Sequence, residues 1–248
     1  MFKNFFQEKK AVLFDLDGTI ANTHPIWNQA CAEVSQNLGF TWRGYNFLTE
    51  PSLEKTWESY LDMSGENYGV PISALVSQTK DKFITKFLSM DPEDILRDGF
   101  WVFLNEIRLE RKMKAGLVTN SDRDVTETLL KHLGINGLFS AIICGDDVKN
   151  RKPDPEMYKK ALGALEVKAE EALCFEDSPT GVKAAQKAGL TIIRIKNPLF
   201  SDKDFPSNLI FVDDFTVFPG NLDKTKKEVL QESLQKVASS KAEPEQGK

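Results

Sequence analysis

The chain has 248 residues, of which 41% are hydrophobic and 28% are charged, a balance typical of soluble globular proteins. Its formal net charge of −5 argues against a basic surface for nucleic acid or anionic lipid. Three widely spaced cysteines argue against a disulfide framework, and no apolar stretch approaches the roughly 20 residues that cross a bilayer. We therefore expect a cytoplasmic protein without a secretory signal, which binds neither nucleic acid nor membranes.

Six short apolar segments are predicted to be strands, because they are rich in β-branched or aromatic residues and lie too far apart for hairpins. These segments are residues 11–14, 115–118, 141–144, 172–175, 190–195 and, as a weaker sixth, 209–212. Amphipathic helical patterns lie between the later segments, over residues 125–133, 157–165 and 182–188. This alternation predicts an α/β fold, with a Rossmann-like, doubly wound parallel sheet as its core.

About a hundred residues separate the first two predicted strands, far more than a crossover connection needs. This interval has apolar residues at helical spacing and no convincing strand, and Asp91-Pro92 looks like the start of its last helix. We expect residues 22–95 to form an inserted α-helical domain, while residues 1–21 and 96–238 form the core. The polar segment 239–248 is predicted to be disordered.

Polar residues follow four of the predicted strands. Asp15 and Asp17 come first, and they point to the same side because alternate residues of a strand share a face. Ile20 argues against a calcium-binding loop here, since such a loop requires glycine at that position. The other polar groups are Thr119-Asn120-Ser121 after the second strand, Lys152 in the loop after the third, and Glu176-Asp177 after the fourth.

Each polar group alone has a common structural explanation, such as a helix cap, a turn or a solvated strand end. Open α/β sheets, however, bind ligands at the carboxyl edge of their strands, and all four groups are expected at that edge. The set therefore indicates one site that combines acids, hydroxyls and a lysine. The hydroxyls and backbone N–H groups after the second strand could converge on an anion.

Four segments resemble the motifs of the haloacid dehalogenase superfamily: FDLDGT from Phe14, LVTNS from Leu117, RKPDP from Arg151 and CFEDSPTGVKAA from Cys174. The resemblance extends over residues 11–195. It is to the branch with a helical cap inserted after the first strand, which includes phosphoglycolate phosphatases and β-phosphoglucomutase. In this branch, residues 22–95 would be the cap.

The resemblance implies a role for each residue at the strand ends. Asp15 would be the nucleophile that forms an aspartyl-phosphate, and Asp17 the general acid and base. The phosphoryl oxygens would be held by Thr119, the Asn120 backbone and Lys152. Mg²⁺ would be bound by Asp15, the Asp17 carbonyl, Asp177 and Glu176, because a hard cation is needed between phosphate and carboxylates.

We therefore expect a monomeric, Mg²⁺-dependent phosphatase that hydrolyses a small phosphorylated metabolite. One alternative is a phosphosugar mutase, but such relatives carry a histidine where this chain has Trp27. A non-catalytic binding protein is the other alternative, and it is disfavoured because Asp15, Asp17 and Lys152 are all present.

The predicted cap offers few clues to the substrate. Candidates for contacting the leaving group are Trp42, Arg43, Tyr45, Trp57 and Tyr60, although packing inside the cap is expected to explain most of them. His24 is predicted either to touch the substrate or to be a residue at a helix start.

Overall fold

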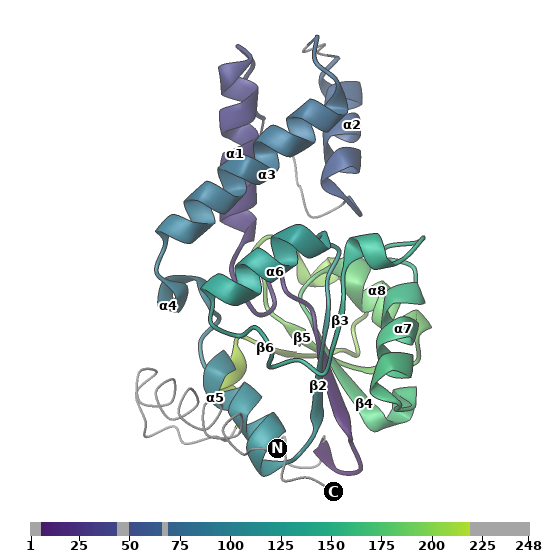
Figure 1. Ribbon diagram of the computed structural model, residues 1–248. Coiled ribbons are helices and arrows are strands. Elements are labelled where there is room, and N and C mark those ends of the chain that lie inside the picture. Colours follow the sequence, from purple (N-terminus) through teal and green to yellow (C-terminus); the bar gives the residue numbers. More distant parts are fainter. Residues whose placement is uncertain (1–5, 44–49, 66–68, 219–248) are drawn as a thin grey trace, which may run out of the picture.

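The computed structural model describes residues 6–43, 50–65 and 69–218, so the predicted disordered segment 239–248 lies outside the described residues. Six parallel strands form one sheet in the order β3-β2-β1-β4-β5-β6 (Figure 1). The strands are β1 (Ala11–Phe14), β2 (Lys114–Val118), β3 (Ala141–Ile143), β4 (Ala172–Glu176), β5 (Thr191–Ile195) and β6 (Ile210–Val212). All six predicted strands and the doubly wound parallel sheet are confirmed.

The strand order brings distant parts of the chain to one edge of the sheet. β1 lies between β2 and β4, and Phe14 at its end is paired with Leu117 on one side and Phe175 on the other. From β1 the chain adds β2 and β3 on one side of the sheet, and it then returns to add β4, β5 and β6 on the other side. The order of the strands therefore reverses at β1. Ligands bind at such a switch point, outside the carboxyl ends of the strands.

Helices cover both faces of the sheet, because residues of each buried strand point alternately to opposite sides. Phe14 packs with residues of α5 and α6, whereas Leu13 packs with residues of α7 and α8. These helices are α5 (Phe100–Asn105), which continues as a π-helix over Glu106–Glu110, α6 (Arg123–His132), α7 (Glu156–Leu165) and α8 (Pro179–Lys187). Short 3₁₀-helices span Gly145–Asp147, Ala169–Glu171, Asp202–Asp204 and Phe215–Val217.

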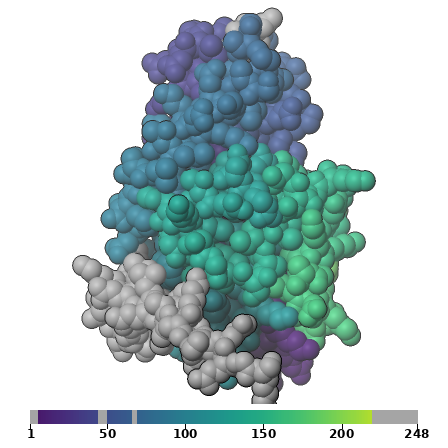
Figure 2. All heavy atoms as spheres, in the orientation of Figure 1, coloured from purple at the N-terminus to yellow at the C-terminus, as the bar shows by residue number. Residues whose placement is uncertain are grey.

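Helices make up most of the described residues in the long interval between β1 and β2. It contains α1 (His24–Asn37), α2 (Leu53–Ser64), α3 (Ile72–Ser89) and α4 (Pro92–Ile95), which starts after Asp91. Helices α1 to α3 rise above the carboxyl edge of the sheet, and they form the purple and blue lobe in Figure 2. The lobe has its own aromatic packing, in which Trp27 stacks on Phe83 with ring centroids 3.6 Å apart.

Two chain segments connect this helical insert to the core, and they run side by side. Ala21 and Leu96 form an isolated antiparallel bridge, and the Asn22 N–H donates to the Ile95 carbonyl at 2.8 Å. None of the helices in the described part of the chain combines the length and the apolar character that a membrane crossing requires.

Candidate active site

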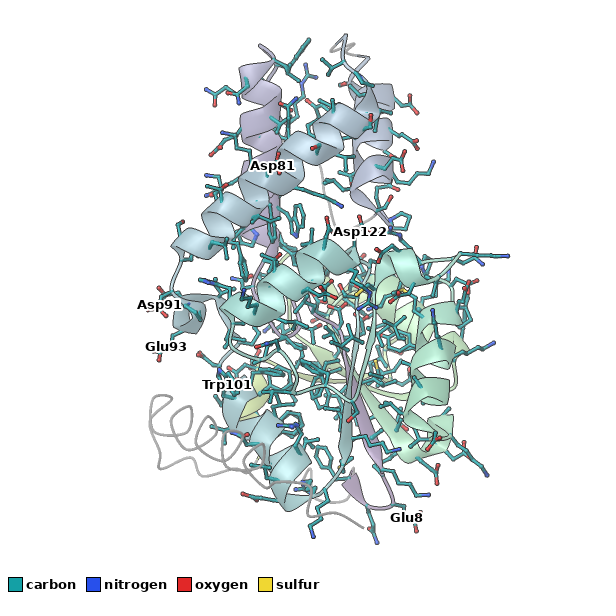
Figure 3. The ribbon with its side chains drawn as sticks, viewed as in Figure 1. Glu8, Asp81, Asp91, Glu93, Trp101 and Asp122 are labelled. Atoms are coloured by element: carbon teal, nitrogen blue, oxygen red, sulfur yellow. The ribbon has the colours of Figure 1, made fainter. Side chains whose placement is uncertain are left out.

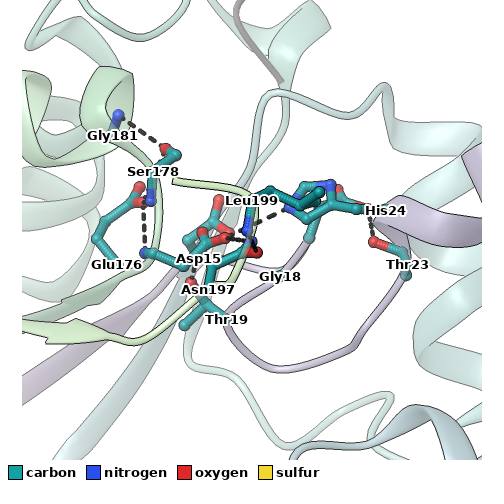
Figure 4. Close-up of polar contacts among 12 residues, drawn as sticks. Asp15, Gly18, Thr19, Thr23, His24, Glu176, Ser178, Gly181, Asn197 and Leu199 are labelled. Atoms are coloured by element: carbon teal, nitrogen blue, oxygen red, sulfur yellow. Dashed lines mark hydrogen bonds and ion pairs between the residues drawn. The ribbon is translucent and has the colours of Figure 1, made fainter. Parts of the chain in front are cut away.

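Asp15 lies directly beyond β1 and is paired with a lysine. Its Oδ1 accepts a hydrogen bond of 2.7 Å from Nζ of Lys152, which comes from the loop before α7 (Figure 4 shows Asp15 beside Glu176). The same Nζ donates to Oε1 of Glu176 at 2.6 Å and to the Val118 carbonyl at 2.7 Å. Lys152 therefore joins the ends of β1, β2 and β4 through one buried ammonium group.

The surroundings of Asp15 disfavour its charged form. Burial raises the pKa of Asp15 well above its ordinary value, Lys152 opposes the shift, and the carboxylates of Glu176 and Asp177 add to it. For Lys152, burial favours the neutral amine, yet Asp15 and Glu176 raise its pKa above the ordinary lysine value. Lys152 is the cation that opposes this shift, and a further cation beside Asp15 would favour its carboxylate form more strongly.

Asp17 is surrounded by neutral hydrogen-bond donors instead of cations. Its Oδ1 accepts from the hydroxyl of Thr23 at 2.6 Å and from Nε1 of Trp27 at 3.3 Å. Its Oδ2 accepts from the hydroxyls of Ser121 at 2.7 Å and Thr119 at 3.3 Å. Two aspartates one residue apart therefore have different surroundings, one ion-paired and the other held by four uncharged groups.

Asp177 is fully buried beside the loop that follows β1. It accepts from the Thr19 hydroxyl at 3.1 Å and from Nδ2 of Asn197 at 2.6 Å, and His24 Nε2 lies 3.4 Å from its Oδ2. Although burial opposes ionisation, hydrogen bonds from His24, Asn197 and Thr19 lower the pKa of Asp177. A Cβ on Gly18 would lie 2.1 Å from Asp177 Oδ2, so only glycine fits at that point.

Both oxygens of Glu176 are already occupied by protein donors. Oε1 accepts from Lys152 and, at 2.6 Å, from the hydroxyl of Tyr158. Oε2 accepts from the Asp177 N–H at 3.2 Å and from the Ser178 hydroxyl at 3.2 Å. This arrangement makes Glu176 the group that orients Lys152.

Carboxylate oxygens of Asp15, Glu176 and Asp177 lie within 4.8 Å of one another, and all three residues are buried. Oxygen donors of this kind suit Mg²⁺, which binds one or two carboxylates and keeps part of its water shell. The residues therefore fit a magnesium ion, with Asp15 and Asp177 less occupied by protein donors than Glu176.

The side chain of Asn120 forms two hydrogen bonds with the backbone of Lys152. Its Oδ1 accepts from the Lys152 N–H at 3.0 Å, and its Nδ2 donates to the Lys152 carbonyl at 3.3 Å. This reciprocal pair ties the loop after β2 to the loop that carries the lysine.

A cleft between the core and the helical insert opens onto these residues. Core residues Asp15, Asp17, Thr119, Asn120 and Lys152 line it. The insert contributes His24, Trp27, Glu50, Pro51, Ser52, Leu53 and Lys80. All the predicted phosphate-binding residues thus face the same space as the two aspartates.

Most of the aromatic residues proposed to meet the leaving group lie elsewhere. Trp57 and Tyr60 are fully buried in the insert, and Trp42 packs against both of them. Arg43 is exposed and is not among the residues that line the cleft, and Tyr45 lies outside the described residues. Helix packing is therefore the explanation for the buried aromatic residues.

Sequence reasoning named Ser121 among the strand-end residues without giving it a role, and it missed three other polar partners: Thr23 and Trp27 on Asp17, and Asn197 on Asp177. Ser121 had a signal, because it follows Thr119 by two residues at a strand end. The other three had none, since only the folded chain brings them to the carboxylates.

The chain is similar to known proteins of one family. Residues 12–195 match the haloacid dehalogenase-like hydrolase family. The chain is 30% identical to validoxylamine A 7'-phosphate phosphatase of Streptomyces hygroscopicus subsp. limoneus, over 73% of this chain and 83% of that one. It is 29% identical to a phosphorylated carbohydrates phosphatase of Thermotoga maritima, over 73% of this chain and 82% of the relative.

A solved structure is also similar. CbbY from Rhodobacter sphaeroides in complex with phosphate superposes with a TM-score of 0.75 and 27% identity, over 84% of this chain and 95% of CbbY. The family match covers well over half of the chain, and it includes every strand-end residue described above. This chain belongs to the haloacid dehalogenase-like hydrolase family.

Proposed function

We propose that this protein is a Mg²⁺-dependent phosphatase that acts on a small phosphorylated metabolite, most simply a phosphorylated sugar. The observation that supports it best is the contrast between the two aspartates. Asp15 is paired with the Lys152 ammonium, whereas Asp17 is held by four uncharged donors. The named relatives that act on phosphorylated carbohydrates support the substrate class.

In the proposed reaction, a carboxylate oxygen of Asp15 attacks phosphorus in line with the ester oxygen. The P–O ester bond breaks, and Asp17 donates its proton to the departing oxygen. Asp17 then takes a proton from a water molecule that attacks the aspartyl-phosphate at phosphorus. Inorganic phosphate and the carboxylate of Asp15 are released.

The surrounding residues would hold the charge that moves during this reaction. The Lys152 ammonium and the Thr119 hydroxyl line the cleft beside Asp15 and would bind the phosphoryl oxygens. Asn120 and Glu176 would keep Lys152 in place through the contacts described above. When bound by Asp15, the Asp17 carbonyl and Asp177, Mg²⁺ would offset the repulsion between phosphate and carboxylates.

Residues 22–95 would act as a cap over this site. Trp27, Ser52, Leu53 and Lys80 from the insert line the cleft that the substrate must enter. Closing that cleft would exclude bulk water and select the leaving group. In this proposal the core catalyses phosphoryl transfer, and the cap recognises the rest of the substrate.

A panel of phosphate esters assayed with Mg²⁺ tests the proposal. We expect inorganic phosphate to be released from p-nitrophenyl phosphate and from at least one sugar phosphate. A mutase would instead convert a sugar phosphate to its isomer without releasing phosphate. Trp27, at the place where mutase relatives have histidine, favours phosphate release.

A further inference from the structure

A chain of ion pairs crosses the cleft from the helical insert to the core. Nζ of Lys80, on α3, lies 2.7 Å from Oδ2 of Asp122, which precedes α6. The other oxygen of Asp122 accepts from NH2 of Arg151 at 2.6 Å. Figure 3 shows Asp122 where the helices of the insert meet the core. All three side chains line the same cleft as the two aspartates.

This cluster leaves neither cation unopposed. Lys80 also lies 3.5 Å from Asp124, and Arg151 also donates to the Asn120 carbonyl at 2.6 Å. Two positive charges thus meet the two negative charges of Asp122 and Asp124. Another carboxylate, Glu50, lines the cleft from the insert. Among the described residues that line the cleft, Lys80 and Arg151 are thus both already opposed by carboxylates.

Lys80 and Arg151 favour the ionised form of Asp122. Partial burial opposes its charge, but hydrogen bonds from Lys80 and Arg151 lower the pKa of Asp122 below its ordinary value. Its side chain is 27% exposed, and those of Lys80 and Arg151 are 21% and 23% exposed. A partly buried group is screened less than a surface charge, so its field extends into the cleft.

The cluster is adjacent along the chain to residues that bind the two aspartates. Asp122 directly follows Ser121, whose hydroxyl binds Asp17, the proposed proton donor to the leaving oxygen. Arg151 directly precedes Lys152, which is paired with Asp15. The part of a substrate beyond its ester oxygen would consequently share the cleft with Asp122 and its two cations.

We propose that Asp122 determines specificity by rejecting a second phosphate, so that the substrate is a monophosphate with an uncharged, hydroxyl-bearing leaving group. To bind Lys80 and Arg151, a distal phosphate would have to displace the carboxylate of Asp122 from both. That carboxylate would then lie unpaired beside a phosphate dianion. Sugar hydroxyls can instead accept and donate hydrogen bonds around the intact ion pairs. This inference rests on the proposed phosphatase function and names its substrate class.

The test compares each monophosphate with the bisphosphate of the same sugar. Suitable pairs are fructose 1-phosphate with fructose 1,6-bisphosphate, and glucose 1-phosphate with glucose 1,6-bisphosphate. The measured quantity is the ratio of kcat/KM for the two esters. We expect the wild-type protein to prefer the monophosphate by about tenfold or more, the size of one unfavourable contact between like charges.

Two variants remove the charge of Asp122. Asp122→Asn keeps the shape of the side chain, and Asp122→Ser also retains a residue suited to the start of α6. Both should lower the preference for the monophosphate by about tenfold, because Lys80 and Arg151 become available to a distal phosphate. Asp124→Asn is the matched control, since Asp124 also faces Lys80 but is 67% exposed and does not line the cleft. Because its contact with Lys80 is longer and more exposed to solvent, Asp124→Asn should change the ratio clearly less than the Asp122 variants do.

The outcomes separate this inference from the proposed function. A wild-type preference for bisphosphates would overturn the inference, and so would an unchanged ratio in both Asp122 variants. An equal change in Asp124→Asn would overturn it as well, because the effect would then be one of overall charge. If the wild-type protein hydrolyses no ester, p-nitrophenyl phosphate included, the proposed function fails and this inference fails with it.

Discussion

The indole Nε1 of Trp27 donates to Oδ1 of Asp17 at 3.3 Å, so the first helix of the insert reaches a carboxylate of the core. The indole ring is held by stacking on Phe83, which belongs to α3. The packing of the insert is therefore coupled to the position of the proposed acid and base.

Replacing Trp27 tests this coupling. Trp27→Phe retains an aromatic ring against Phe83 but removes the N–H, and we expect kcat to fall by about tenfold with less change in KM. The control is Trp57→Phe, which removes the N–H that donates to Thr79 at 3.1 Å inside the insert. That variant should lower Tm without lowering kcat. Equal losses of kcat in the two variants would contradict a specific role for Trp27.

Asp15 is predicted to be indispensable. Asp15→Asn should reduce hydrolysis of every phosphate ester by roughly 10³-fold or more, because an amide is a poor nucleophile towards phosphorus. Lys152 keeps its contacts with Glu176 and the Val118 carbonyl, so the variant should remain folded. Phosphate release and thermal unfolding are measured on the same preparation. Retained turnover would exclude Asp15 as the nucleophile.

Activity should disappear with EDTA and return with Mg²⁺. Within the acidic cluster, Asp177 and Glu176 should affect different kinetic quantities. Asp177→Asn is expected to raise the Mg²⁺ concentration needed for half-maximal activity, because Asp177 belongs to the buried carboxylate cluster. Glu176→Gln should instead raise KM, since Glu176 binds the Lys152 ammonium and orients it. Titrations of activity against Mg²⁺ and against substrate distinguish the two effects. Activity that resists chelation would refute the metal requirement.

Gly181 is predicted to be necessary for the position of Glu176. A Cβ at Gly181 would lie 1.9 Å from Oε1 of Glu176, and therefore Gly181→Ala should lower the free energy of unfolding by about 1–3 kcal/mol. Activity should fall with it, because Glu176 holds Lys152. Gly163→Ala is the control, since it lies within α7 with nothing within 4 Å of the new Cβ. That change should raise stability by roughly 0.5–1 kcal/mol. Urea unfolding measures both.

Alkaline pH is expected to destabilise the fold through a buried thiol. Burial raises the pKa of Cys31 from 9.0 to about 12, so the unfolded chain loses this proton first as pH rises. The free energy of unfolding should therefore be fully retained below about pH 9 and decrease between about pH 9 and pH 12. Cys31→Ala should reduce that decrease, although it lowers stability at neutral pH. Urea unfolding of the wild-type protein and of Cys31→Ala at pH 7, 9 and 10.5 gives the change of unfolding free energy with pH. The same change in both proteins would contradict the prediction.

The sequence alone predicted the strands, the helical insert and the residues at the strand ends. These features depend on short windows of sequence: apolar runs make buried strands, helical spacing makes amphipathic helices, and a residue just after a strand lies at the edge of the sheet. Asp15, Asp17, Thr119, Asn120, Lys152, Glu176 and Asp177 were found in this way. The motif resemblance then pointed to the family that the comparison confirmed.

What those residues do to one another was decided only by the tertiary structure. Lys152 meets Asp15 across 137 positions of sequence, and Lys80 meets Asp122 from a different lobe. No local pattern distinguishes Glu176, which binds the Lys152 ammonium, from Asp177 beside it, which accepts from Thr19 and Asn197. The partners of a polar side chain depend on how distant elements pack, because a buried charge or hydrogen-bonding group must be satisfied by whatever the fold brings to it. Sequence periodicity therefore determined which residues reach the edge of the sheet, and packing determined their roles there.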